Sequence, residues 1–252
     1  MRPLEGIAVV ELGMWVAAPA AATMLADWGA DVVKVEAPTG DPNRYTLRHV
    51  GQDIDSAPPF ETDNRGKRGI VLDLRSDEGK DALERLLERA DVFVTNLRPG
   101  ALERLGLAPD ELRARHPGLV IGTLTGYGWT GAERDRAGYD VSAFWARPGI
   151  AAMLNPAGEP PPGIRPGLGD RTAASNLVAG VLAALLRRAR TGEGGVVDVS
   201  AAPLRHVRQW QRPGPAELLR QARAYPPPHR ARVPALQLLP GRRRPLVLAG
   251  RS

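Results

Sequence analysis

Residues 167–200 read GLGDRTAASNLVAGVLAALLRRARTGEGGVVDVS, and this stretch contains the two elements that decide the fold. A glycine-flanked aspartate, Asp170, opens a long run of apolar and small residues that ends at Gly192. Helices commonly end at such a glycine. The β-branched run Val196–Val199 then predicts a short strand. A helix that leads directly into a strand is typical of α/β proteins.

The first 200 residues alternate in the same way between β-branched strands and amphipathic helices. This alternation predicts an α/β fold with a Rossmann-like parallel sheet and flanking helices. Ligands of such sheets bind beyond the carboxyl ends of the strands, so the site is expected in the loops after those ends. Strands are predicted at residues 7–12, 31–36, 70–74, 92–95 and 119–124, and helices at residues 19–28, 76–89, around 101 and at 109–115.

Asp170 is the candidate reactive group. A helix amino terminus carries about half a positive charge, which favours an ionised carboxylate with available lone pairs. Such a carboxylate suits a nucleophile. The alternative is simple capping, because aspartate is among the best residues for closing a helix start.

The composition excludes several classes of protein. There is no cysteine, so disulfides, thiolate nucleophiles and cysteine zinc sites are absent. The apolar stretch at residues 14–25 follows Glu5 and Glu11 and only one arginine, Arg2, whereas a signal peptide has a basic start. No apolar run reaches the roughly 18–20 residues that span a bilayer. We therefore expect a cytoplasmic protein that does not enter a membrane.

Other short motifs lack the context that their chemistry needs. Residues 126–131 match the dinucleotide pattern G-x-G-x-x-G, but no apolar helical face follows them. Gly66-Lys67 is followed by Arg68 rather than by the serine or threonine of a phosphate-binding loop. The four histidines form no ligand pairs, and no G-x-S-x-G element is present. Metal sites and serine-hydrolase chemistry are not expected.

Four segments in combination resemble the class III CoA-transferases, the CaiB/BaiF family, from about Leu4 to Ser200. They are NRGKRGIVLDL (residues 64–74), ADVFVTNLRPGALERLGL (90–107), LTGYGWTGAERDRAGYD (124–140) and the opening stretch at 167–200. The resemblance implies transfer of CoA from an acyl-CoA thioester to a carboxylic acid. It implies Asp170 as the nucleophile, through an aspartyl anhydride and an aspartyl-CoA thioester, with no permanently bound cofactor.

The resemblance also implies a set of CoA contacts. Turn formation alone would explain the residues Asn96 to Gly100 after their strand. In similar proteins, however, the matching asparagine, the apolar residue after it and an arginine contact the nucleotide part of CoA. Pro38 and Ala137 depart from the family pattern, because some relatives carry basic residues there. The implied CoA-binding residues are Val16, Ala17, Leu72, Asn96, Leu97 and Arg104.

Tyr139 separates two chemistries of the family. The related α-methylacyl-CoA racemases need a histidine at this position to move a proton. A phenol with a pKa near 10 is a poor base at neutral pH. The residue therefore favours CoA transfer over the alternative, a racemase-like enzyme. A packing role for Tyr139 is equally compatible with the sequence.

The last 52 residues differ in composition from the rest of the chain. Residues 201–252 hold 11 arginines, nine prolines and one acidic residue, which gives them a net charge of +10 and leaves residues 1–200 at −4. We divide the chain accordingly into a Rossmann-like portion, residues 1–200, and an irregular, disordered tail, residues 201–252. With only Trp210 and Tyr225 as aromatic residues, the tail is not expected to bind nucleic acid specifically.

A shift of reading frame after Ser200 is one explanation of this tail. When the tail is translated back into codons, these can be chosen so that the frame shifted by one nucleotide encodes a different peptide. That peptide resembles the sequence with which the family continues after this strand. Similar proteins are longer and form interlocked homodimers. From the sequence we therefore expect a truncated, inactive chain in which this dimer does not close, with a non-catalytic CoA-binding fragment as the alternative.

Overall fold

The structure is a computed structural model that describes residues 1–49, 51, 57–154, 159, 165 and 167–202. The chain divides into two units, residues 1–209 and 210–252, and the second lies outside the described residues. The predicted disorder of the tail and its altered frame therefore concern residues that, apart from 201 and 202, are not described.

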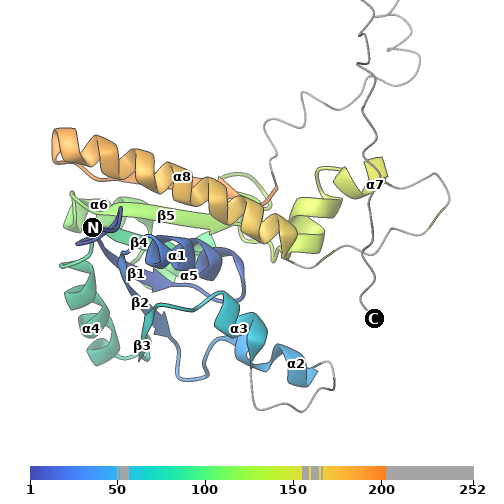
Figure 1. Cartoon of the computed structure of the whole chain (residues 1–252), viewed down its shortest axis with the longest axis horizontal. Helices are drawn as coiled ribbons and strands as arrows, with labels where there is room; N and C mark the ends of the chain where they lie inside the picture. Colours follow the sequence, from blue (N-terminus) through green and yellow to red (C-terminus); the bar gives the residue numbers. More distant parts are fainter. Residues whose placement is uncertain (50, 52–56, 155–158, 160–164, 166, 203–252) are drawn as a thin grey trace, which may run out of the picture. The chain divides into compact units, whose positions relative to one another are not determined.

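The first unit is built on one parallel sheet (Figure 1). Its strands are β1 (Ala8–Leu12), β2 (Asp31–Glu36), β3 (Arg68–Val71), β4 (Val92–Thr95), β5 (Val120–Thr125) and β6 (Gly195–Ser200). Their spatial order is β3-β2-β1-β4-β5-β6, and every neighbouring pair is parallel. This order is that of doubly wound Rossmann sheets, so the predicted fold class is confirmed.

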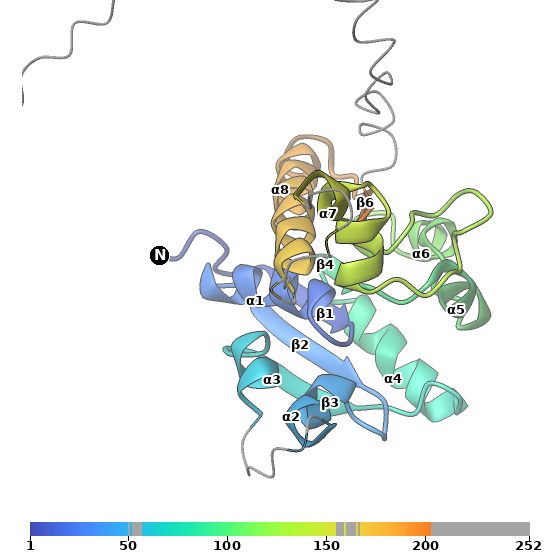
Figure 2. The same cartoon turned by 90° about the vertical axis from the view of Figure 1, so that its right-hand side faces the viewer.

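Helices cover both faces of the sheet (Figure 2). On one face, α1 (Ala17–Asp27) and α8 (Leu168–Thr191) pack on Val9, Val94 and Val120. Alanines on α1 allow the two helices to approach closely. The other face is covered by α4 (Asp77–Leu87), α5 (Pro99–Arg104) and α6 (Pro109–Arg115), whose leucines pack on Val10, Phe93 and Ile121.

The differences from the predicted elements have local causes. Strand β3 begins two residues before the predicted Ile70 and ends at Val71, because it is an exposed edge strand without a buried apolar pattern. The sequence did not predict five short helical segments, which contact neighbouring segments rather than presenting a long apolar face. They are η1 (Pro42–Tyr45), α2 (Thr46–His49), α3 (Pro58–Thr62), η2 (Val141–Ala146) and α7 (Ile150–Leu154).

The carboxyl end of the sheet continues past Ser200. The Ala201 N–H donates to the carbonyl of Thr125 at 2.8 Å, and the Ala202 N–H donates to the carbonyl of Gly126 at 3.0 Å. Both alanines are buried, with Tyr127 and Ala143. The first two residues assigned to the tail thus pack with the sheet, while the boundary proposed for the two parts stays a prediction.

A group of buried charges lies beneath the carboxyl ends of β1 and β2. Glu11 is fully buried, and its two oxygens contact two lysines. Lys34 Nζ lies 2.8 Å from Glu11 Oε1, and Lys67 Nζ lies 2.6 Å from Glu11 Oε2. Burial opposes the charge on Lys34, yet the carboxylates of Glu11 and Asp41 raise its pKa above the ordinary value. Burial lowers the pKa of Lys67 despite its contact with Glu11.

The entry into β6 requires a glycine at position 194. A Cβ added to Gly194 would lie 2.0 Å from the carbonyl oxygen of Leu119, whereas one added to Gly118 meets nothing closer than 3.9 Å. We expect Gly194→Ala to lower the free energy of unfolding by about 1–3 kcal/mol, because the backbone must shift to relieve the overlap. Gly118→Ala is the control and should change it little. Urea unfolding followed by circular dichroism measures both, and equal effects of the two substitutions would contradict this account of β6.

Candidate active site

Asp170 lines a pocket at the carboxyl edge of the sheet. The pocket has a volume of about 230 Å³ and lies between the turn before α1, the loops after β4 and β5, and the start of α8. This is the edge at which ligands of parallel sheets bind. Its lining residues are Met14, Trp15, Val16, Ala17, Asn96, Arg98, Leu124, Thr125, Gly126, Ala137, Gly138, Tyr139, Asp170 and Ala201.

The start of α8 places Asp170 in the first helical turn without using it as a cap. Gly167 is the residue before the helix, with φ +79°, and Asp170 is the third helical residue. No side chain caps this end. The simple capping role considered for Asp170 is therefore not observed, and the residue lines the pocket.

The electrostatic surroundings of Asp170 differ from the sequence expectation. Burial, followed by the nearby carboxylate of Asp140, raises the pKa of Asp170 to about 6, although the Arg171 guanidinium acts in the opposite direction. The helix amino terminus was expected to hold this carboxylate well ionised. Burial and a second carboxylate, neither of which the sequence indicated, oppose this ionisation. At neutral pH the group is still mostly ionised.

One ion pair, one hydrogen bond and close packing fix the start of α8. Arg171 contacts both oxygens of Asp63 at 3.0 Å, which directs its guanidinium away from a direct bond to Asp170. The Asp140 Oδ2 accepts the Gly167 N–H at 2.8 Å. Gly169 must be a glycine, because an added Cβ would lie 2.2 Å from Asp140 Oδ1. Because the Gly167 N–H is already bonded, only later amides of this turn are free to stabilise an oxyanion.

Asn96 supports the opposite wall of the pocket. Its Oδ1 accepts the Met14 N–H at 3.0 Å, and its Nδ2 donates to the Met14 carbonyl at 2.7 Å. The amide of Asn96 thus bonds both backbone polar groups of Met14, as a neighbouring β-strand would, and so holds the turn before α1. A Cβ on Gly13 would lie 2.8 Å from the Ala18 Cβ and 3.3 Å from Asn96 Oδ1, so this close approach depends on glycine.

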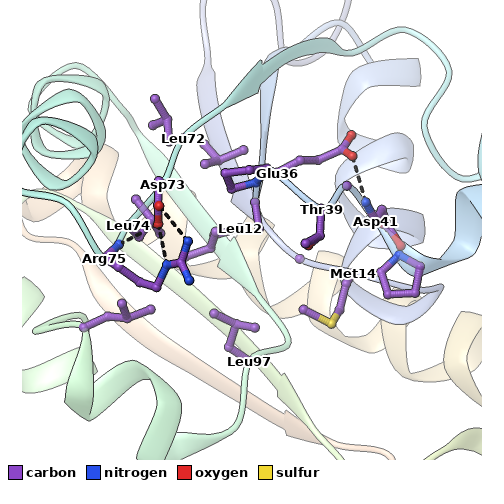
Figure 3. Close-up of a pocket in the computed structure, with 17 residues that line it drawn as sticks. Leu12, Met14, Glu36, Thr39, Asp41, Leu72, Asp73, Leu74, Arg75 and Leu97 are labelled. Atoms are coloured by element: carbon purple, nitrogen blue, oxygen red, sulfur yellow. Dashed lines mark hydrogen bonds and ion pairs between the residues drawn. The ribbon is translucent and has the colours of Figure 1, made fainter.

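A second pocket adjoins the first and shares Met14 with it. It has a volume of about 390 Å³ and is formed by the carboxyl ends of β1, β2 and β3 together with the start of the loop after β4. Figure 3 shows the Asp73–Arg75 pair at one side and the contact between Glu36 and Asp41 at the other, with Leu12 between them. Most lining side chains are apolar, which suits a flat ring with a polar rim.

The residues implied as CoA contacts are divided between these two pockets. Val16, Ala17 and Asn96 line the pocket of Asp170, whereas Leu72 and Leu97 line the larger one. Arg104 lines neither. It is exposed at the end of α5, beside the lining residue Leu105, and within the described part of the chain it forms no ion pair.

The two departures from the family pattern also fall on these pockets. Pro38 lines the larger pocket and Ala137 the smaller one. Arginines stand close to both: Arg75 lines the larger pocket and is paired with Asp73, and Arg98 lines the smaller one. The Arg75 side chain holds the pKa of Asp73 low, at about 2.

The glycine-rich segment after β5 is a loop. Residues 126–139 contain no helix, and Gly128 and Gly131 have φ values of +88° and +95°. The segment thus lacks the helix amino terminus that a dinucleotide pyrophosphate needs. Within the described residues no three side chains are grouped as a metal site would require, and no helix is long and apolar enough to cross a bilayer.

The sequence analysis missed three residues of the site. Trp15 contacts Tyr139 edge to face, with ring centroids 5.8 Å apart and an interplanar angle of 89°. Asp140 and Asp63 come from segments distant in sequence from α8. Only the position of Asp140, directly after Tyr139, gave a hint of its role, because neither aspartate belongs to a pattern with Asp170.

Comparison with known proteins identifies the family of this fold. The sequence matches the family described as CoA-transferase family III over residues 4–237, which extends beyond the expected limit at Ser200. It is 42% identical over 200 residues to the (R)-2-hydroxy-4-methylpentanoate CoA-transferase of Clostridioides difficile, covering 78% of this chain and 50% of that protein. It is also 42% identical over 198 residues to the cinnamoyl-CoA:phenyllactate CoA-transferase of Clostridium sporogenes, covering 78% and 48%.

Solved structures give the same result. A CaiB/BaiF family protein from Brucella suis superposes with a TM-score of 0.73 at 37% identity, covering 79% of this chain and 53% of that one. Protein Rv3272 from Mycobacterium tuberculosis superposes with a TM-score of 0.74 at 36% identity, covering 90% and 61%. The chain spans about half the length of the curated relatives it matches. On this fold, these pockets and these matches, the chain belongs to the class III CoA-transferases, the CaiB/BaiF family.

Proposed function

We propose that the chain is a CoA-transferase portion that moves CoA from an acyl-CoA thioester to a carboxylic acid, with Asp170 as the nucleophile. The observation that carries this proposal is the position of Asp170, mostly ionised at neutral pH, in a pocket that adjoins a larger, apolar one. The activities in the names of the relatives are of this kind.

The two pockets suggest how CoA is bound. The adenine nucleotide occupies the larger pocket against Leu72 and Leu97, and the pantetheine arm passes Met14, which lines both pockets. The thioester then reaches the smaller pocket, beside Val16 and Ala17. Arg104 is free to contact a phosphate, and a guanidinium offers paired hydrogen bonds to such a group.

The chemistry follows from a carboxylate placed beside a thioester. An oxygen of Asp170 attacks the thioester carbonyl, the carbon–sulfur bond breaks, and CoA leaves as a thiolate with an aspartyl anhydride left behind. The thiolate attacks the aspartyl carbonyl of that anhydride and releases the donor acid. An acceptor carboxylate then attacks the aspartyl-CoA thioester, and the thiolate returns to the acceptor's acyl carbon, which restores Asp170. Covalent catalysis thus divides one difficult transfer into easier steps.

The relatives are longer than this chain, and this difference decides which step of the reaction is tested first. Because the chain spans about half of those proteins, we propose that complete transfer, the choice of acid and any interlocked homodimer use residues outside the matched part. Acylation of Asp170 needs only the two pockets described above. It is therefore the first reaction to measure, and no permanently bound cofactor enters it.

Acylation is tested by removing the nucleophile. Incubation of the chain with cinnamoyl-CoA, followed by mass spectrometry with and without hydroxylamine, should show a labile adduct on Asp170. Asp170→Ala should abolish it, and Asp110→Asn, an exposed aspartate on α6, should retain it. An adduct that persists in Asp170→Ala would assign the nucleophile elsewhere. CoA binding without any adduct would favour a non-catalytic CoA-binding fragment.

The ionisation of Asp170 has a measurable cost in stability. Its pKa is raised in the fold, so the folded state binds the proton more tightly and loses stability as pH rises from about 4 through about 6. Asp170→Asn should therefore leave the free energy of unfolding nearly unchanged at pH 4 and raise it by about 1–3 kcal/mol at pH 7.5. Urea unfolding at the two pH values measures this. Asp110→Asn is the control, and a gain equal at both pH values would contradict the raised pKa.

The phosphate role of Arg104 is tested by binding. Arg104→Ala should weaken CoA binding by roughly 5- to 30-fold, because a charge-assisted contact contributes about 1–2 kcal/mol. Arg113→Ala, which removes an arginine of α6 that is likewise exposed, should leave the dissociation constant unchanged. Isothermal titration calorimetry with CoA measures both. Equal losses would indicate only a general effect of positive charge.

A further inference from the structure

The turn that leads into α1 contains a tryptophan in a disfavoured backbone conformation. Trp15 has φ +64°, and it is the only non-glycine residue with positive φ within the described ranges. A bulky side chain rarely adopts this region unless surrounding contacts impose it. The conformation of this turn therefore depends on the contacts that hold the Trp15 backbone.

Asp41 makes the contact that holds this turn. Its Oδ1 accepts the Trp15 N–H at 3.0 Å and the Asn43 N–H at 2.9 Å. Asn43 in turn donates its side-chain amide to the Trp15 carbonyl at 3.3 Å. The loop after β2 thus fixes both polar groups of the Trp15 backbone, in addition to the bonds that Asn96 makes to Met14.

A buried lysine orients the Asp41 carboxylate. Lys34 Nζ lies 3.0 Å from Asp41 Oδ2 and also contacts Glu11. Asp41 and Lys34 are each 2% exposed, and Lys34 donates a further hydrogen bond to the Gly13 carbonyl at 3.0 Å. With one oxygen directed at the lysine, the other oxygen of Asp41 remains directed at the turn.

The turn so held forms part of the pocket of Asp170. Trp15 and Tyr139 contact each other edge to face, and both line that pocket with Asp170. Tyr139 itself is largely exposed, so Trp15 is the aromatic neighbour that limits its position. Moving the Trp15 backbone would change the shape of the pocket that Asp170 lines.

We propose that Asp41 is a positioning residue, which holds the Trp15 turn against Tyr139 and thereby shapes the pocket in which Asp170 reacts. This inference rests on the proposed function for its catalytic consequence. The geometric part does not depend on that function, because it concerns the placement of one aromatic pair.

The experiment compares four variants of the full 252-residue chain. Asp41→Ala removes the acceptor of the Trp15 N–H, whereas Asp41→Asn retains an oxygen in its place. Asp91→Ala is the matched control: Asp91 also accepts a backbone N–H, from Ala8, and pairs with an arginine, Arg188, but it lies at the opposite end of the sheet. Near-ultraviolet circular dichroism reports on Trp15, and Trp15→Phe identifies its band.

Asp41→Ala should lose the band that Trp15→Phe loses, while Asp41→Asn should keep at least half of it. Asp91→Ala should lower the melting temperature but keep the band. In the acylation assay, Asp41→Ala should reduce the rate at saturating cinnamoyl-CoA by at least tenfold, with Asp41→Asn restoring most of the rate.

Two results would overturn the proposal: the Trp15 band survives in Asp41→Ala, or it is lost equally in the Asp91→Ala control. A lost band with an unchanged acylation rate would overturn the catalytic part. If the wild-type chain forms no adduct at all, the proposed function fails, and the circular dichroism comparison alone decides whether Asp41 places the turn.

Discussion

The buried carboxylate of Glu11 is the contact on which the ligand edge of the sheet depends. It joins Lys34 of β2 and Lys67, the residue before β3, to the central strand β1. Removing charged groups from water costs free energy unless each charge keeps its oppositely charged partner. Lys67 also donates to the carbonyls of Pro19 and Asp63, so the same cluster fixes the start of α1 and the loop before β3. A displaced strand here would leave a buried charge unpaired.

The contacts of this buried cluster continue from the sheet to the two pockets. Lys34 contacts both Glu11 and Asp41, and Asp41 holds the turn through Trp15. Asn96 holds the same turn at Met14 from the loop after β4. Met14 in turn lies between the two pockets. The wall that divides the two pockets is therefore a short turn held from two directions, rather than part of a helix or strand.

Element bounds that depend on residues close in sequence are predicted from the sequence. Site features that depend on residues distant in sequence are not. Strand β4 and helix α6 have the predicted bounds, because the buried apolar run of the strand and the proline at the start of the helix lie within those segments. The choice of Asp170 as the candidate reactive group also comes from one segment. Its raised pKa does not, because the cause includes Asp140 and burial by other elements. The support from Asp41 joins the loop after β2 to the turn before α1, and no periodic pattern records such a pairing.

The raised pKa of Asp170 connects the stability of the fold with its chemistry. A fully solvated carboxylate is stable and weakly reactive, because water hydrogen bonds must be lost before it attacks a carbonyl. Burial beside Asp140 removes part of that solvation before any reaction. The same burial lowers the free energy of unfolding when the carboxylate is ionised. The opposing contribution of Arg171 keeps the pKa near 6 rather than higher, so the group still ionises at neutral pH. Because Arg171 is paired with Asp63, it lowers the pKa of Asp170 without a direct bond to the carboxylate that we propose as the nucleophile.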